Sequence, residues 1–241
     1  MVITPFMDHI RYLGREGGHE LAEHGDYLTL KTGLPHPMGN WVVGHGLPRE
    51  PATLFPGSLP FLWLSEPWSV ELDRALQELG LAPDPLMGVA APLESLASGA
   101  GDPRVSVTDD FDRWCRVAGE VWHAPPSLMQ SLFRAYAKPQ GPGLLFLAEV
   151  GAKEAGCALL HCERGVAGLH WNAVLPQYRG KGLGSALVEA RIGFARERGC
   201  HTGVAACRDT SLRIFERLGF QQTGALASYL PKQFAEKLAM F

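Results

Sequence analysis

Residues 177–184, Gln-Tyr-Arg-Gly-Lys-Gly-Leu-Gly, have the composition of an anion-binding loop. They follow a strand-like run at 166–174 and lead into a helix-like run at 183–198. Glycine permits positive φ and lets a ligand approach the main chain closely. The first amides of a helix have no hydrogen-bond partner within the helix, and they lie at the positive end of its dipole. Arg179 and Lys181 add positive charge beside them. The loop is therefore predicted to bind a phosphate or pyrophosphate group.

Two common phosphate-binding motifs do not fit this loop. A P-loop requires Gly-x-x-x-x-Gly-Lys followed by Ser or Thr, and the sequence contains no such string. A dinucleotide-binding fold places its glycine-rich loop after the first strand of a βαβ unit. Here the loop comes late in the chain, after three strand-like runs joined by short turns. A third kind of phosphate-binding loop is therefore needed.

The string at 174–182, Val-x-Pro-Gln-x-x-Gly-x-Gly, resembles the acyl-CoA loop of the GCN5-related N-acetyltransferases, the GNAT superfamily. A second string, Asp-Thr-Ser-Leu-Arg-Ile-Phe-Glu-Arg-Leu-Gly-Phe at 209–220, is similar to the helix that closes the GNAT fold. The two strings occur in the family's order and are separated by one helix-like and one strand-like run. Their combination is more specific than either string alone.

The resemblance covers about residues 104–230 and implies a GNAT fold of the α/β (α+β) class, with a mixed central sheet flanked by helices. Residues 101–241 are expected to form this acetyl-CoA-binding catalytic domain. Residues 1–100 are expected to form a smaller, degenerate GNAT-like accessory domain, because they lack a loop string of their own. The small, glycine-rich stretch 97–103 ends in a proline and is the predicted linker.

The expected element order of the second half is strand, two helices, three-stranded meander, helix, strand, helix and strand. In the helix after the loop, apolar spacing predicts a buried stripe and places Arg191 on the outer side. The helices before the meander carry three aromatic residues that are predicted to be core, with a substrate pocket as the alternative: Trp114, Trp122 and Tyr136.

The composition bounds the class of protein. The chain has 241 residues, 46% of them hydrophobic, and a net charge of −3, which gives no electrostatic argument for nucleic-acid binding. It has no apolar run long enough for a membrane span and no N-terminal signal core, so a cytoplasmic protein is expected. Five cysteines without a Cys-x-x-Cys pair suggest neither disulfides nor zinc, and no metal is expected. Monomer and homodimer both remain open.

The resemblance assigns acetyl-CoA as co-substrate and implies which residues bind it. The main chain of Asn172, Ala173 and Val174 would hydrogen-bond the pantetheine arm, and the loop amides would hold the pyrophosphate. The other expected cofactor-binding residues lie in the loop, the helix after it and the closing helix: Gln177, Arg179, Gly180, Lys181, Gly182, Leu183, Gly184, Ser185, Asp209, Ser211 and Phe215.

The closing helix departs from the family pattern at two positions. Phe215 stands where a tyrosine often protonates the leaving thiolate, and it has no proton to give. Asp209, the expected N-cap, stands where an asparagine often contacts CoA. Tyr229, Ser211 or water can take the place of the missing acid, and the sequence does not choose among them.

Two residues are candidates for the general base. His170 lies on the strand before the loop and has an ordinary pKa near neutrality, while Glu149 lies at the end of the first meander strand. Strand alternation predicts that His170, Asn172 and Val174 share one face, with Trp171 on the other. A partly buried structural histidine and a solvated strand-end glutamate are the corresponding non-catalytic interpretations.

The function implied by the resemblance is metal-free transfer of an acetyl group from acetyl-CoA to a primary amine of a small molecule or peptide. An alternative is a degenerate acyl-CoA-binding or sensory protein without turnover, which Phe215 favours. Acylation of a hydroxyl, or use of an acyl group longer than acetyl, is a third possibility. The acceptor itself is not specified, because substrate pockets on this fold are built from variable loops.

Overall fold

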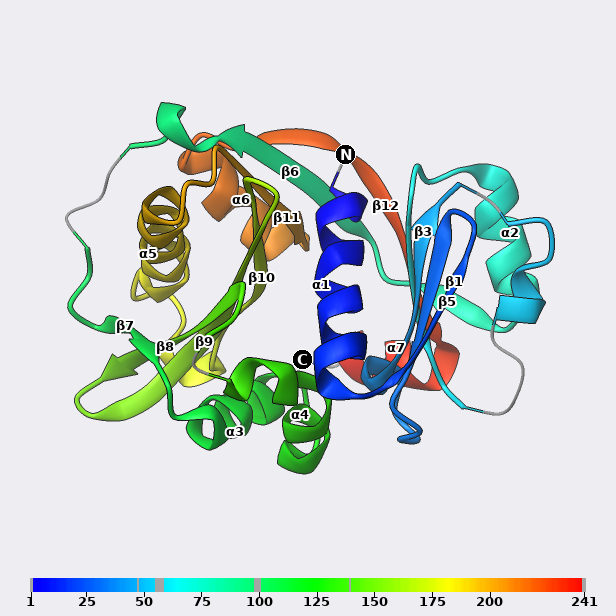
Figure 1. Cartoon of the computed structure of the whole chain (residues 1–241), viewed down its shortest axis with the longest axis horizontal. Coiled ribbons are helices and arrows are strands. Elements are labelled where there is room, and N and C mark those ends of the chain that lie inside the picture. The colour runs from blue at the N-terminus through cyan, green and yellow to red at the C-terminus, as the bar shows by residue number, and fades with distance from the viewer. Residues whose placement is uncertain (1, 47, 55–58, 98–100, 139, 240–241) are drawn as a thin grey trace. The chain divides into compact units, whose positions relative to one another are not determined.

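The computed structural model describes residues 2–46, 48–54, 59–97, 101–138 and 140–239. By internal contacts, the chain divides into two compact units, Met1–Gly88 with Thr223–Phe241, and Val89–Gln222 (Figure 1). These units are defined by contacts within the chain. The predicted division into an accessory domain, 1–100, and a catalytic domain, 101–241, stays a prediction. Residues 98–100 of the expected linker lie outside the described residues.

The first unit is a sheet with helices on its faces. Its strands run in the order β1-β2-β3-β4-β12, and β5 also pairs with β12. Strands β3 and β4 pair in parallel. The pairs β1–β2, β2–β3, β4–β12 and β5–β12 are antiparallel. The elements are α1 (Ile3–Gly17), β1 (Glu20–His24), β2 (Tyr27–Lys31), β3 (Asn40–His45), β4 (Leu62–Glu66), α2 (Val70–Glu78), β5 (Leu81–Pro83), β12 (Gln221–Pro231) and α7 (Lys232–Ala239).

Alternation along β3 explains how two helices share this sheet. Trp41 packs against Phe6 of α1, with ring centroids 5.4 Å apart. Val42 points to the opposite side, into the cluster that contains Leu72 and Leu76 of α2. Ser69 caps α2, its hydroxyl accepting from the Leu72 amide at 3.1 Å.

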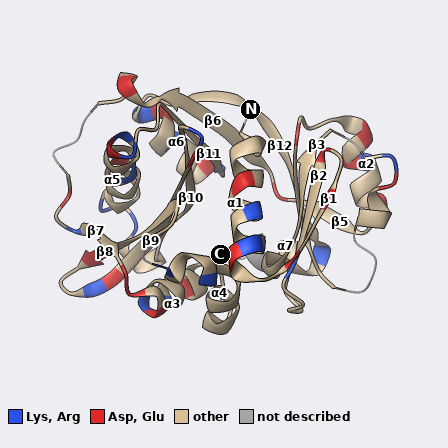
Figure 2. Ribbon diagram, viewed as in Figure 1, with Lys and Arg blue, Asp and Glu red and all other residues tan. Residues whose placement is uncertain are grey.

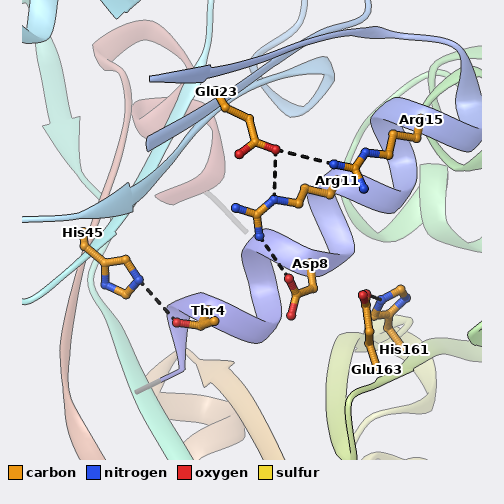
Figure 3. A network of polar contacts seen from close by, with 8 residues as sticks. All are labelled: Thr4, Asp8, Arg11, Arg15, Glu23, His45, His161 and Glu163. Atoms are coloured by element: carbon orange, nitrogen blue, oxygen red, sulfur yellow. Dashed lines mark hydrogen bonds and ion pairs between the residues drawn. The ribbon is translucent and has the colours of Figure 1, made fainter. Parts of the chain in front are cut away.

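Helix α1 was not among the expected elements, and a network of polar contacts holds one of its faces (Figure 3). Glu23 of β1 lies 3.3 Å from Arg11 Nε and 3.6 Å from Arg15 Nη2. Arg11 Nη1 also donates to Asp8 Oδ1 at 3.0 Å, and Thr4 Oγ1 lies 3.3 Å from His45 Nε2. These polar contacts attach the helix to β1 and β3. They add to the apolar packing of α1 on the sheet.

From β7 to α6 the second unit follows the element order that the sequence predicts for a GNAT fold, while the predicted last strand, β12, belongs mainly to the first unit. Its sheet runs β6-β11-β10-β9-β8-β7, and it is mixed because β10 and β11 pair in parallel. Helix α5 covers one face, while α3 and α4 cover the other (Figure 1). The elements are β6 (Leu86–Pro92), β7 (Val105–Thr108), α3 (Phe111–Val121), α4 (Pro126–Phe133), β8 (Gly143–Val150), β9 (Lys153–Glu163), β10 (Val166–Val174), α5 (Leu183–Glu197), β11 (Thr202–Cys207) and α6 (Asp209–Arg217).

Charges of both signs are distributed over the helices and loops of each unit (Figure 2). Over the described parts of the chain, no helix combines the length and apolar character needed to cross a membrane.

Trp114 anchors α3 to the sheet of the second unit. It is fully buried, its Nε1 donates to the Ala158 carbonyl at 3.0 Å, and its ring packs against Phe133 at 5.1 Å. Trp114→Ala is expected to lower the free energy of unfolding by about 3–5 kcal/mol, because it leaves a large cavity. Trp114→Phe should cost less, since a ring still packs on Phe133 and the cavity is smaller, although the hydrogen bond to Ala158 is lost. Urea unfolding of both variants checks this order, and a loss below about 1 kcal/mol for Trp114→Ala would contradict it.

Candidate acyl-CoA site

The loop between β10 and α5 has the geometry that its glycines predict. After a short 3-10 turn at Pro176–Tyr178, Gly180 and Gly182 both take positive φ, at 76° and 79°. Gly182 is the N-cap of α5 and has no side chain to satisfy the first amides of that helix. A Cβ built on Gly180 meets nothing within 4 Å. The main chain of the loop is therefore open to a bulky anion.

Gly184 has a different role from the other two loop glycines. A Cβ at Gly184 would lie 2.9 Å from Ile214 Cδ1 of α6, so this glycine permits close packing of the two helices. Leu183 is 1% exposed, which leaves its amide rather than its side chain to contact a ligand. Gln177 is exposed in the 3-10 turn, and Ser185 is half-buried in the first turn of α5.

Three cationic side chains surround the loop. Arg179 Nε donates to the Val174 carbonyl at 3.2 Å, which brings the loop and the end of β10 together. Lys181 Nζ lies 5.4 Å from the centroid of the Tyr178 ring. Arg104, which the sequence analysis did not select, donates to the Lys181 carbonyl at 3.1 Å. Its hydrogen bonds to Asp102 hold the pKa of that carboxyl at about 2, so the pair stays ionised beside the loop.

Strand β10 separates from β11 before it reaches the loop. Their parallel register joins Val166–Gly168 to Thr202–Val204, and both strands continue beyond it. On its other edge β10 stays paired to β9, through Ala173 with Cys157 and Val174 with Gly156. Among the described strands, no backbone pairing with β11 reaches 172–174, and on this edge the Val174 carbonyl accepts from Arg179 Nε. The rest of this edge is open to a ligand, as expected for a pantetheine-binding edge.

A bulge in β10 overturns the predicted side-chain alternation. The register with β9 shifts between His170 and Ala173, and Trp171 has φ 54°, which is unusual for a bulky residue. Trp171 packs on Phe133 of α4, whereas the Asn172 side chain accepts a hydrogen bond from Arg191 of α5. The prediction that His170 and Asn172 share a face was wrong, because the bulge changes the period-2 pattern.

Arg191 is buried rather than exposed, which corrects a second prediction. It is 0% exposed and lies on the inner stripe of α5 between Leu187 and Ala195. Its position four residues from each of these buried neighbours was the signal that the sequence offered. Burial lowers the pKa of Arg191 to about 9, and the guanidinium still carries its charge at neutral pH.

His170 lies beneath α3 and α4, close to a second buried histidine. Its ring covers Gly168, which pairs across the strands with His161. His161 Nδ1 lies 2.9 Å from the Tyr136 hydroxyl, and His161 Nε2 lies 3.3 Å from Glu163 Oε2 (Figure 3). Burial, the charge of His161 and the charge of Arg191 lower the pKa of His170 well below its ordinary value. His170 is therefore a neutral imidazole at physiological pH.

This lowered pKa makes folding sensitive to acid. The unfolded chain protonates His170 more readily than the folded chain, so the free energy of unfolding should fall as the pH drops below about 6.5. The limiting slope from one such group is about 1.4 kcal/mol per pH unit. His170→Gln should reduce the slope measured by urea unfolding between about pH 5 and pH 7.5. An unchanged slope would assign the acid sensitivity elsewhere.

The other two catalytic candidates are held by ionic or hydrogen-bonded partners. Glu149 is ion-paired with Arg113, which also donates to Glu154 at 2.7 Å. Tyr229 belongs to the first unit, and its hydroxyl donates to Asp73 Oδ1 at 2.5 Å and accepts from Trp68 Nε1 at 3.2 Å.

Burial and then Asp73 raise the pKa of Tyr229 to about 12, so its phenol holds the proton tightly. The catalytic roles of Glu149, His170 and Tyr229 stay predictions.

The closing helix α6 carries the last three expected cofactor-binding residues, whose roles in binding stay predictions. Phe215 is 2% exposed and packs edge-to-face on Phe220 at 5.0 Å, as a core residue. Arg208, not Asp209, is the N-cap, since Asp209 is already the first helical residue. Ser211 Oγ donates to the Arg208 carbonyl at 3.0 Å, which uses its proton locally.

Two of the three predicted core aromatics, Trp114 and Trp122, are linked through Phe133 and Trp171, while Tyr136 contacts His161. Trp114 is fully buried and Tyr136 is 7% exposed, as expected of core residues. Trp122 is half-buried and packs edge-to-face on Trp171, with centroids 5.0 Å apart. The part of the chain that the structure describes holds no group of three or more metal-ligating side chains.

Known proteins share this loop-bearing domain. Residues 107–220 match the acetyltransferase (GNAT) family. The chain carries a domain of the GNAT superfamily. A curated relative, an uncharacterised N-acetyltransferase from Methanocaldococcus jannaschii, is 30% identical over 95 residues, which are 35% of this chain. The match spans only 42% of that relative's length.

Solved structures extend the GNAT likeness, as a fold, to nearly the whole chain. A GCN5-related N-acetyltransferase from Kribbella flavida superimposes with a TM-score of 0.67 at 17% identity, covering 95% of both chains. A GNAT-family acetyltransferase described as putative, from Novosphingobium aromaticivorans, gives 0.60 at 18% identity, covering 87% of this chain and 89% of its own. The expected α/β fold with a mixed sheet flanked by helices is confirmed.

Proposed function

We propose that this chain transfers an acetyl group from acetyl-CoA to a primary amine of a small molecule or peptide. The observation that carries the proposal is the open loop at 179–182, which joins the free edge of β10 to the N-terminus of α5 in a GNAT domain. The amides from Arg179 to Gly184 would bind the pyrophosphate, assisted by Lys181 and by the hydroxyl of Ser185. The backbone of 172–174 would bind the pantetheine arm.

The chemistry requires a base more than an acid. The amine nitrogen attacks the thioester carbonyl, a C–N bond forms, the C–S bond breaks, and CoA leaves as its thiolate. His170 is proposed to accept the proton that the amine loses, because its imidazole is neutral at physiological pH, although the burial that lowers its pKa also makes it a weaker base than a free histidine. Phe215 has no proton to donate, so water is proposed to protonate the thiolate. No residue of the proposed site calls for a metal.

The alternative function is acyl-CoA binding without turnover. One observation favours it: the position of the usual acid holds Phe215, which is packed into the core. The two functions share the loop and differ only in release of CoA. We further propose that residues 101–241 form the catalytic domain, that residues 1–100 are accessory, and that the protein acts in the cytoplasm as a monomer or homodimer.

A thiol-release assay tests the proposal directly. Purified protein, acetyl-CoA and a panel of small amines and peptide N-termini are mixed, and free CoA is measured with a thiol reagent. Release that depends on the amine supports transfer, and mass spectrometry should then find one added acetyl group on the acceptor. Tight binding of acetyl-CoA with release no faster than uncatalysed hydrolysis for every amine would favour the binding-only function.

A further inference from the structure

The guanidinium of Arg191 connects α5 to β10, which carries the proposed pantetheine edge, and to β9, which pairs with the opposite edge of β10. Its Nε donates to the Leu187 carbonyl of its own helix at 2.9 Å. Its Nη1 donates to the carbonyls of Leu159 at 3.2 Å and His170 at 3.0 Å. Its Nη2 donates to Asn172 Oδ1 at 2.7 Å. All three nitrogens of a fully buried cation are therefore used.

Two of these acceptors immediately flank the bulged residue of β10. His170 precedes Trp171 and Asn172 follows it, and Trp171 has φ 54°. A bulky residue in this region persists only where its surroundings hold it. Trp122 and Phe133 contact the indole on one side of the sheet, and Arg191 binds the neighbouring main chain and side chain from the other.

Burial of this charge is not explained by packing. The other buried residues of α5 are Leu183, Ala186, Leu187, Val188, Ile192 and Ala195. An apolar side chain would fit this stripe without the desolvation cost of an arginine. What an apolar side chain cannot do is bind the carbonyl before the bulge and the amide oxygen after it. The geometry of the guanidinium, with forked donors in one plane, suits that task.

We propose that Arg191 is a positioning residue that holds the β10 bulge, so that the main chain of 172–174 is presented to the pantetheine arm. The inference rests on the proposed binding of CoA. Arg191 touches no reacting atom in this scheme. It acts through Asn172 and the His170 carbonyl, and it links the bulge to the helix whose N-terminus forms the phosphate loop.

The first test compares two ligands in calorimetric titrations. CoA contains the pantetheine arm, while 3′-phosphoadenosine diphosphate has the pyrophosphate and lacks that arm. Arg191→Met should weaken CoA binding by roughly 10- to 100-fold and leave the shorter probe within about two-fold of wild type. Asn172→Ala removes one acceptor at a half-buried position and should weaken CoA binding by a smaller factor. This variant provides the test if Arg191→Met does not fold.

Arg196→Met is the matched control on the same helix. Arg196 also bonds backbone carbonyls, Leu93 through Nε at 3.0 Å and Leu96 through Nη2 at 2.6 Å, but none of these lies on β10. Its substitution should leave both affinities unchanged. Equal weakening of both probes by Arg191→Met, or no weakening of CoA, would overturn the positioning role.

A crystal structure of the ligand-free Arg191→Met variant, or of Asn172→Ala, separates this inference from the proposed function. The bulge should relax, and Trp171 should leave the positive-φ region in the arginine variant. Retention of the wild-type bulge would overturn the inference even if CoA binds normally to wild type. If wild type binds neither probe, the proposed function fails, and the positioning role falls with it.

Discussion

Gly182→Trp is expected to weaken CoA binding by roughly 100-fold or more. Gly182 has φ 79° and lies at the N-cap of α5, where a Cβ would lie 4.0 Å from Arg104 Nη2 and an indole is expected to crowd the loop amides proposed to bind the pyrophosphate. Each hydrogen bond to a charged group contributes about 1.5–3 kcal/mol, so losing two amide contacts accounts for a change of this size. Calorimetric titration with CoA measures the effect.

The matched control is Gly151→Trp. Gly151 has φ 57° in the exposed turn between β8 and β9, and a Cβ there meets nothing within 4 Å. Both substitutions place a tryptophan at positive φ, at a similar cost of about 1–2 kcal/mol in backbone strain. Only the Gly182→Trp variant should lose affinity for CoA. Equal affinity in the two variants would remove the loop from the binding site.

His170→Ala is expected to reduce turnover by roughly 100-fold or more, which is the usual range for loss of a general base. CoA affinity should change little, because the proposed contacts of CoA are to the backbone at 172–174 and to the loop. Since the pKa of His170 lies well below its ordinary value, the wild-type rate should not fall with an apparent pKa near 6.5 on account of this group. Steady-state rates between about pH 5 and pH 9 check both points.

Glu149→Gln provides the comparison, since it removes the charge of the competing candidate and keeps the side-chain shape. Its carboxylate is ion-paired with Arg113, so we expect a small effect on turnover if His170 is the base. A near-normal rate in His170→Ala together with a collapsed rate in Glu149→Gln would assign the proton transfer to Glu149 instead.

The loop and the order of elements were predictable because their signals are local. Gly180 and Gly182 mark positive φ by their residue type, and the apolar spacing of α5 marks a helix of the observed length. Helix α1 carries the same kind of signal, with buried Ile3, Phe6 and Ile10 at helical spacing. It was missed although the sequence contains it.

The bulge and the buried arginine were not predictable by the rules applied. Alternation assumes an unbroken strand, and the conformation of Trp171 depends on residues from α3, α4 and α5 that are distant in sequence. Arg191 was placed outside because arginines are mostly exposed, even though its spacing from Leu187 placed it on the inner stripe. Catalytic roles require distances between side chains, which a sequence alone does not provide.

The most direct test of the central claim is a calorimetric titration of wild type and Gly182→Trp with CoA and acetyl-CoA, with Gly151→Trp as control. The account predicts saturable binding of both ligands to wild type and to the control, and loss of both in Gly182→Trp. Absence of binding to the folded wild-type protein would contradict the account, and the loop would then be only a turn between a strand and a helix.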